Sequence, residues 1–212
     1  VVDKPSLLKP FTFHGLIFSG KVGESQRTTQ CPFCDRPNKF YVNEANGLWE
    51  CKVCSESGNV ATFIKRLYEE SKKVKCDYAE ITKERKLLFP STLEGWGLCK
   101  SMITGEWMLP WYTIDPVTQS PRICQLYLYR KDLGSPGGKN RFICQGWTNA
   151  DDNVKVSHGL FCNGYDKKKG SIHLVEGVWD AAAYKEVLSR TNVGDDGTVT
   201  YVGAKETSIY TK

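Results

Sequence analysis

The chain has 212 residues, of which 40% are hydrophobic and 25% are charged, a composition that fits a folded globular protein and excludes a disordered one. No apolar run approaches the roughly 20 residues that cross a bilayer, and the first residues lack the basic stretch and apolar core of a secretory signal. The net charge of +5 is compatible with a nucleic-acid partner without requiring one. We therefore expect a protein of the cell interior with no membrane partner.

Four of the nine cysteines form two pairs near the start of the chain. The pattern is CPFC, sixteen intervening residues and then CKVC. Between the pairs, KFYV and LWEC have the character of strands, and Asn46-Gly47 is a hairpin turn signal that would bring the second pair beside the first. This arrangement predicts one structural Zn²⁺ with four thiolate ligands and no open position for catalysis. The predicted ligands are Cys31, Cys34, Cys51 and Cys54.

Two other interpretations of the paired cysteines are a redox site and two disulfides. A thioredoxin-like CxxC opens a helix after a buried strand, and neither pair has that setting. The other five cysteines are scattered singly, which favours small buried side chains and free thiols in a reducing compartment.

Cations and aromatic residues surround the predicted zinc site. Arg36, Lys39 and Lys52 lie in or near the hairpin, and Trp49 is on its second strand. Such residues contact phosphates and stack on bases, which predicts a surface for nucleic acid. The alternative is that Trp49 and Phe40 form the small core of the ribbon, and that the cations offset the charge of the zinc tetrathiolate.

Further along the chain, the stretch from Asn59 to Tyr68 has apolar residues at helical spacing, and the charged segment 71–86 is the expected linker. From about residue 87 the composition becomes aromatic and β-branched, and MLPWYTID and ICQLYLYRKD predict two strands. The stretches SIHLVEGVWDAAAYKEVLSR and TVTYVGAKET predict a strand, a tight turn, a helix and a second strand, the opening βαβ of a parallel sheet.

Two carboxylates flank the tight turn of this βαβ unit. Glu176 ends the first predicted strand and Asp180 opens the helix. Oxygen ligands at the carboxyl end of a parallel strand can hold a divalent cation, and Mg²⁺ in such a site supports nucleotidyl transfer. The alternative is that Asp180 is a helix N-cap and Glu176 an isolated acid.

Together, these motifs resemble those of DnaG-type primases. CPFC, CKVC and SESGNVATFI are similar to the zinc-binding domain of that family, with Cys34 where bacterial enzymes usually carry His and phage primase–helicases carry Cys, and with Asn59 in place of the usual acid. HLVEGVWD is similar to the first motif of the Toprim fold, which topoisomerases, RecR and some nucleases share. The resemblance implies a zinc ribbon that reads single-stranded DNA template and a polymerase that joins nucleoside triphosphates into RNA primers with Mg²⁺ or Mn²⁺.

The resemblance also implies roles for individual residues. Glu176 matches a metal ligand or general base, and Asp180 supports it. Arg130 and Lys139 match residues that line the groove for template and nucleoside triphosphates, and Arg141 is included by proximity. The implied setting is the replisome in the cytoplasm of a bacterial or phage-infected cell, with a replicative helicase, fused or separate, as partner.

The expected fold class is thus a small β zinc ribbon, a linker and the start of a primase-type Toprim domain with a parallel sheet. We expect a template-binding ribbon at 1–70, a linker at 71–86, the N-terminal subdomain of the polymerase at 87–168 and the start of Toprim at 169–212. Because the family's Asp-x-Asp pair does not occur at the expected place before Lys212, we expect a fragment that is inactive alone.

Three other functions stay open: a recombination mediator similar to RecR, a nuclease, and a non-catalytic DNA-binding module. About 120 residues separate Cys54 from Glu176, whereas a RecR-like order would place the two motifs nearly adjacent. An Asp-x-Asp pair encoded downstream would distinguish an enzyme from a binding module.

Overall fold

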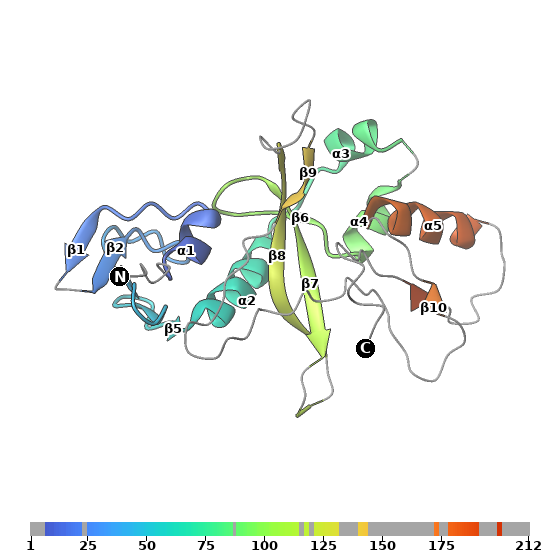
Figure 1. Cartoon of the computed structure of the whole chain (residues 1–212). Coiled ribbons are helices and arrows are strands. Elements are labelled where there is room, and N and C mark those ends of the chain that lie inside the picture. The colour runs from blue at the N-terminus through green and yellow to red at the C-terminus, as the bar shows by residue number, and fades with distance from the viewer. Residues whose placement is uncertain are drawn as a thin grey trace.

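The structure, a computed structural model, describes residues 7–22, 25–86, 88–114, 117–118, 121–131, 140–143, 172–173, 178–190 and 199–200. Three sheets follow one another along the chain: one of five strands, one of four strands and a parallel pair. In Figure 1 the four-stranded sheet stands between the N-terminal and C-terminal parts. No helix among the described residues has the length and apolar character needed to cross a membrane.

The N-terminal sheet, here called the ribbon sheet, consists of short antiparallel strands in the order β1-β2-β3-β4-β5. The predicted hairpin is confirmed as β3 and β4, in which Val42 lies opposite Trp49. Gly47 closes the turn with φ +69, and its N–H donates to the Asn43 carbonyl at 2.8 Å; glycine adopts this left-handed conformation without steric cost. The strands are β1 (Gly20–Val22), β2 (Gln26–Thr29), β3 (Phe40–Asn43), β4 (Trp49–Cys51) and β5 (Ser57–Gly58).

Two helices, α1 (Lys9–Phe13) and α2 (Val60–Ser71), pack against the ribbon sheet. The predicted helix is confirmed as α2, and Asn59 caps it by accepting a hydrogen bond from the Thr62 N–H at 3.0 Å. Phe63 of α2 lies 6.1 Å from Phe40 and 4.7 Å from Phe11, measured between ring centroids. These three fully buried rings form the centre of the ribbon core.

The middle sheet is antiparallel throughout, in the order β6-β7-β8-β9. The two strands predicted after residue 87 are confirmed as β7 and β8. They form a long hairpin whose pairing register shifts between Trp111 and Tyr112. The strands are β6 (Cys99–Lys100), β7 (Trp107–Ile114), β8 (Pro121–Lys131) and β9 (Asn140–Ile143). The short helices α3 (Ala79–Glu84) and α4 (Pro90–Gly95) precede them, and α3 lies inside the segment predicted as a linker.

One hydrophobic core joins the ribbon to the middle sheet. Helix α2 packs on β8, and the buried cluster that contains Phe40 and Phe63 also contains Met108 and Leu128 of the middle sheet. A second cluster joins that sheet to α3, α4 and α5 (Val178–Arg190), with Ile81 of α3 among its members. The segment between the ribbon and the sheet is therefore packed into the fold.

The C-terminal part differs from the parallel sheet that the sequence predicts. Strands β10 (Ile172–His173) and β11 (Val199–Thr200) pair in parallel, with α5 between them in the chain. This order is the expected βαβ, but within the described ranges the parallel pairing is limited to these two short strands, and a parallel Toprim sheet is not seen. The larger sheet is antiparallel because a short hairpin connection joins β7 to β8, and such a connection cannot join parallel strands.

Candidate zinc centre and the surface around it

The four predicted cysteine ligands meet at one end of the ribbon. The sulfur atoms of Cys31, Cys34, Cys51 and Cys54 all lie within 4.8 Å of one another. The Cys34 and Cys51 sulfurs are 3.7 Å apart, and the Cys31 and Cys54 sulfurs are 4.0 Å apart. Tetrahedral zinc with Zn–S bonds of about 2.3 Å requires sulfur–sulfur distances of about 3.8 Å, so the cluster fits a structural zinc ion. All four are free cysteines, with sulfurs much too far apart for disulfides.

Each cysteine pair is held in the same tight turn. Asp35 follows the first pair with φ +57, and its N–H donates to the Cys31 carbonyl at 2.9 Å. Ser55 follows the second pair with φ +57, and its N–H donates to the Cys51 carbonyl at 3.1 Å. A left-handed residue directly after each pair reverses the chain there. Sequence reasoning missed these two positions, although a short polar residue after each CxxC was the available signal.

The thiols differ in how readily they ionise. Burial opposes the charged form of Cys51, but the N–H groups of Cys54 and Val53 favour the thiolate and lower the pKa of Cys51 to about 7. Burial raises the pKa of Cys31 and of Cys54. Because zinc binds thiolates, loading the site releases protons and depends on pH.

Trp49 lies in the ribbon core instead of on a nucleic-acid surface. Its side chain is 3% exposed, its ring stacks on Phe40 at 5.1 Å, and its indole N–H donates to the Asn59 carbonyl at 2.8 Å. A ring enclosed in this way offers no free face to a base, so the contact predicted for Trp49 does not fit this structure. Strand alternation explains the placement: Trp49 shares the buried face of the sheet with Val42, whereas Tyr41 faces the other side.

The three cations predicted beside the zinc site are exposed. The backbone N–H of Lys52 donates to the Lys39 carbonyl at 3.0 Å, so these two residues lie side by side, and Arg36 is on the loop that leads to Lys39. The Lys52 ammonium lies 2.5 Å from the Glu50 carboxylate and 5.9 Å from the centre of the Tyr41 ring. The zinc end of the ribbon therefore combines cations with the partly exposed Tyr41 ring.

Arg130 is engaged within the fold. Its guanidinium lies 2.5 Å from the Glu106 carboxylate, donates to the Phe13 carbonyl at 3.3 Å and covers the Phe13 ring at 4.7 Å. These contacts tie β8 to α1, and Glu106 balances the charge that the sequence assigned to template or nucleotide binding. Arg141 lies opposite Arg130 in the pairing of β8 and β9, and Lys139 lies outside the described residues.

Of the two predicted catalytic carboxylates, only Asp180 lies in the described part of the chain. Asp180 is exposed in the first turn of α5, where the helix dipole favours an acid, and Glu176 lies outside the described residues. The neighbouring Trp179 fixes this turn, because its ring meets the Tyr129 ring edge-on at 5.4 Å and the Arg85 guanidinium lies 4.9 Å from its centre. The start of α5 is thereby held against the middle sheet.

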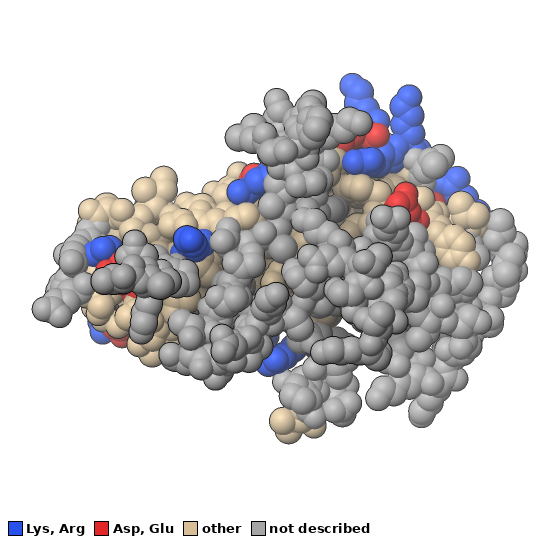
Figure 2. All heavy atoms as spheres, viewed as in Figure 1, with Lys and Arg blue, Asp and Glu red and all other residues tan. Residues whose placement is uncertain are grey.

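A second group of cations lies away from the cysteine cluster. Figure 2 shows Lys and Arg side chains projecting over α3, at the top of the view, whereas the ribbon is at the left. Lys83 and Lys86 are exposed in this segment, and Arg85 points inward and donates to the Tyr129 hydroxyl at 2.9 Å. Among the described residues, exposed cations therefore lie over α3 as well as at the zinc end of the ribbon.

No protein-family model matches the chain, and no curated protein matches its sequence. Among solved structures, the chain is similar to the zinc-binding and RNA polymerase domains of the Aquifex aeolicus primase, with 15% sequence identity and a TM-score of 0.41. The match covers 96% of this chain and 66% of that one, so this chain spans just under two thirds of its neighbour. At this identity and TM-score the similarity is coarse.

Proposed function

We propose that the zinc end of the ribbon binds single-stranded DNA, and that the chain is the template-binding part of a primase-type RNA polymerase. The observation that carries the proposal is the meeting of four cysteine sulfurs at zinc-site distances directly beside exposed cations. The resemblance of CPFC…CKVC and EGVWD to primase motifs supports the choice of this function among those open to zinc ribbons.

The proposed contacts with the strand come from the residues that the metal holds in place. Arg36 and Lys39 follow the first cysteine pair, and Lys52 lies within the second, so a zinc ion that joins the pairs fixes the three cations relative to one another. They would contact phosphates while the Tyr41 ring stacks on a base. With three phosphate contacts, the logarithm of the binding constant should fall with the logarithm of salt concentration with a slope of about −2.

The polymerase part of the proposal concerns the whole protein. In the whole protein, Glu176 and Asp180 would hold Mg²⁺ or Mn²⁺, and the cation would stabilise the negative charge that develops during nucleotidyl transfer. The partners would be the template strand, nucleoside triphosphates and a replicative helicase. Lys139 and Arg141 would contact template or nucleotide, whereas the Glu106 ion pair supports a role for Arg130 in holding the fold.

The binding proposal can be tested by fluorescence anisotropy with a labelled single-stranded oligonucleotide over a range of salt concentrations. Replacing Arg36, Lys39 and Lys52 together by Ala should lower affinity at least tenfold and bring the salt slope close to zero. The matched control replaces Lys65, Lys73 and Lys75 by Ala, which removes the same charge from other exposed positions. Equal losses in the two triple variants would contradict binding at the zinc end.

The polymerase proposal can be tested on the whole protein with a template, nucleoside triphosphates and Mg²⁺. Short RNA products are expected, and Glu176→Ala should abolish them while leaving single-stranded DNA binding unchanged. Full synthesis by Glu176→Ala would refute the catalytic assignment. Nicking of DNA without RNA synthesis would instead identify a nuclease, and strand binding without either activity would identify a binding module.

A further inference from the structure

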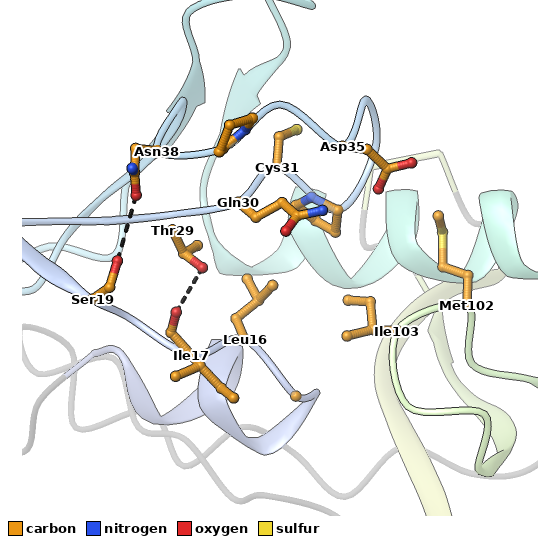
Figure 3. Close-up of a pocket in the computed structure, with 13 residues that line it drawn as sticks. Leu16, Ile17, Ser19, Thr29, Gln30, Cys31, Asp35, Asn38, Met102 and Ile103 are labelled. Atoms are coloured by element: carbon orange, nitrogen blue, oxygen red, sulfur yellow. Dashed lines mark hydrogen bonds between the residues drawn. The ribbon is translucent and has the colours of Figure 1, made fainter.

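A pocket of about 600 Å³ lies where the ribbon meets the turn between β6 and β7. Figure 3 shows that its walls come from three segments: the chain before β1, the loop around the first cysteine pair, and the β6–β7 turn. Its size falls within the range of about 300–1,000 Å³ that is typical of small-ligand sites. The wall residues that matter here are Ile17, Ser19, Gln30, Asp35, Asn38 and Met102.

The walls are held in place from both sides. The N–H of Met102 donates to the Ser71 hydroxyl at the end of α2 at 3.1 Å, and the Thr29 hydroxyl donates to the Ile17 carbonyl at 2.7 Å. The core shared by the ribbon and the middle sheet lies behind them. The pocket is therefore formed before any ligand arrives.

One wall of the pocket is polar. Gln30, Asp35 and Asn38 are exposed along the first cysteine loop. The Ser19 hydroxyl donates to the Asn38 side-chain oxygen at 3.4 Å, which orients that amide. Within the described part of the chain, the Asp35 carboxylate has no hydrogen-bond donor or cation as partner, so it is available as an acceptor.

The other walls expose apolar side chains to water. Ile17 is 82% exposed and Met102 is 40% exposed, and both line the pocket. An apolar surface beside a polar edge matches a ligand that has flat apolar faces and a hydrogen-bonding rim, as a nucleobase has.

We infer that this pocket binds one unpaired base of the DNA strand and prefers cytosine to thymine. The inference rests on the proposed function, because Asp35 and Asn38 directly precede the two cations proposed to contact phosphates, Arg36 and Lys39. A strand that passes those cations brings a base within reach of the pocket. The Asp35 carboxylate only accepts hydrogen bonds, so it pairs with the cytosine amino group and repels the thymine carbonyl.

The test compares labelled oligo(dC) and oligo(dT) of equal length by anisotropy, since the two strands share the same backbone. We expect wild-type protein to bind oligo(dC) about tenfold more tightly, the discrimination of one good base contact. Asp35→Asn should reduce the ratio to within about twofold, because an amide can also donate to the thymine carbonyl. Asn accepts the left-handed backbone at this position, where φ is +57, and zinc content checks that the ribbon is folded.

The matched control is Asp77→Asn, which removes the same charge from an exposed position outside the pocket and should leave the oligo(dC) to oligo(dT) ratio unchanged. Equal binding of the two strands by wild-type protein, or an unchanged ratio in Asp35→Asn, would overturn the pocket assignment while the proposed function stands. Displacement of oligo(dC) by micromolar dCMP would assign the pocket to free nucleotides and overturn its assignment to the strand. Failure to bind either strand would instead refute the proposed function.

Discussion

The Arg130 guanidinium and the Glu106 carboxylate lie 2.5 Å apart, with the Phe13 ring stacked on the guanidinium at 4.7 Å. Both charged side chains are 29% exposed, so the ion pair is only partly screened by water. Phe13 comes from α1 and Arg130 from β8, so this contact joins residues more than 100 positions apart. It is one of the contacts that fasten the ribbon to the middle sheet.

Arg130→Met should lower the free energy of unfolding by about 2 kcal/mol, because it leaves the half-buried Glu106 carboxylate without its cation. Chemical denaturation measures the change, and adding Glu106→Gln should recover part of the loss in a double-mutant cycle. Affinity for single-stranded DNA should stay within about twofold. A variant with unchanged stability and weakened DNA binding would show that Arg130 is a strand contact.

Loss of zinc should destabilise the middle sheet as well as the ribbon. Phe40 and Phe63 share one buried cluster with Met108 and Leu128, so a ribbon that unfolds without metal exposes one face of the sheet. We expect Cys51→Ser to abolish zinc binding and to increase amide hydrogen exchange in β7 and β8, read by mass spectrometry.

The control for that experiment is Cys124→Ser, since Cys124 lies outside the cluster and its thiol donates to the Trp111 carbonyl at 3.3 Å, a bond that serine can make. It should retain zinc and native exchange rates. If Cys51→Ser increased exchange only in the ribbon strands, the ribbon and the middle sheet would unfold independently, and the prediction would be wrong.

His14 should make the protein less stable in mild acid. Burial, followed by the nearby charge of Arg130, lowers the pKa of His14 to about 3 from 6.5. His14 of the unfolded chain therefore takes up a proton below pH 6.5, whereas His14 of the folded chain takes one up only near pH 3. Protonation thus favours the unfolded chain, and the free energy of unfolding decreases as pH falls from 6.5 towards 3. Between pH 7 and pH 5 this group should remove about 2 kcal/mol.

The test of His14 is urea denaturation of wild-type protein and of His14→Phe at pH 7 and pH 5. The variant should lose about 2 kcal/mol less than wild type over that interval, since Phe has no titrating group. The difference between the two proteins cancels the effects of pH on zinc binding, which both share. Parallel losses in the two proteins would mean that His14 is protonated in the folded state.

Helix α5 is anchored at its far end by Glu186, which is 4% exposed. Its carboxylate accepts from the Thr92 hydroxyl of α4 and from the Arg190 guanidinium at 3.4 Å. Thr92→Val keeps the side-chain shape but removes a hydrogen bond to a buried charge, and should cost about 1–3 kcal/mol in denaturation experiments. Thr12→Val, which removes an exposed hydroxyl that donates to the Lys9 carbonyl at 3.2 Å, should stay within about 0.5 kcal/mol, and a similarly small effect at Thr92 would argue against the anchor.

The parts of the fold that local sequence determines were predictable. The cysteine spacing and the Asn46-Gly47 turn predicted the β3–β4 hairpin, and the apolar spacing predicted α2. For Trp49 the sequence left a nucleic-acid contact and the ribbon core open, because composition alone does not say which side of a strand a residue faces; pairing with Val42 places it in the core. The Arg130–Glu106 pair could not be foreseen, because its partners meet only once β7 and β8 are paired and α1 is docked.

The pocket beside the cysteine cluster was also hidden in the sequence. Its apolar wall includes Met102 from the β6–β7 turn, while its polar wall comes from the loop around Asp35. Those segments are neighbours only because α2 packs on β8 and brings the ribbon to the middle sheet. Tertiary packing, which neither periodicity nor motif spacing reports, creates this part of the site.

The most direct test of the zinc centre, on which the proposed function depends, is X-ray absorption at the zinc edge of the purified native protein. We predict one zinc per chain with four sulfur ligands at about 2.3 Å. Native protein without bound zinc, or a zinc shell containing nitrogen or oxygen ligands in place of sulfur, would contradict it.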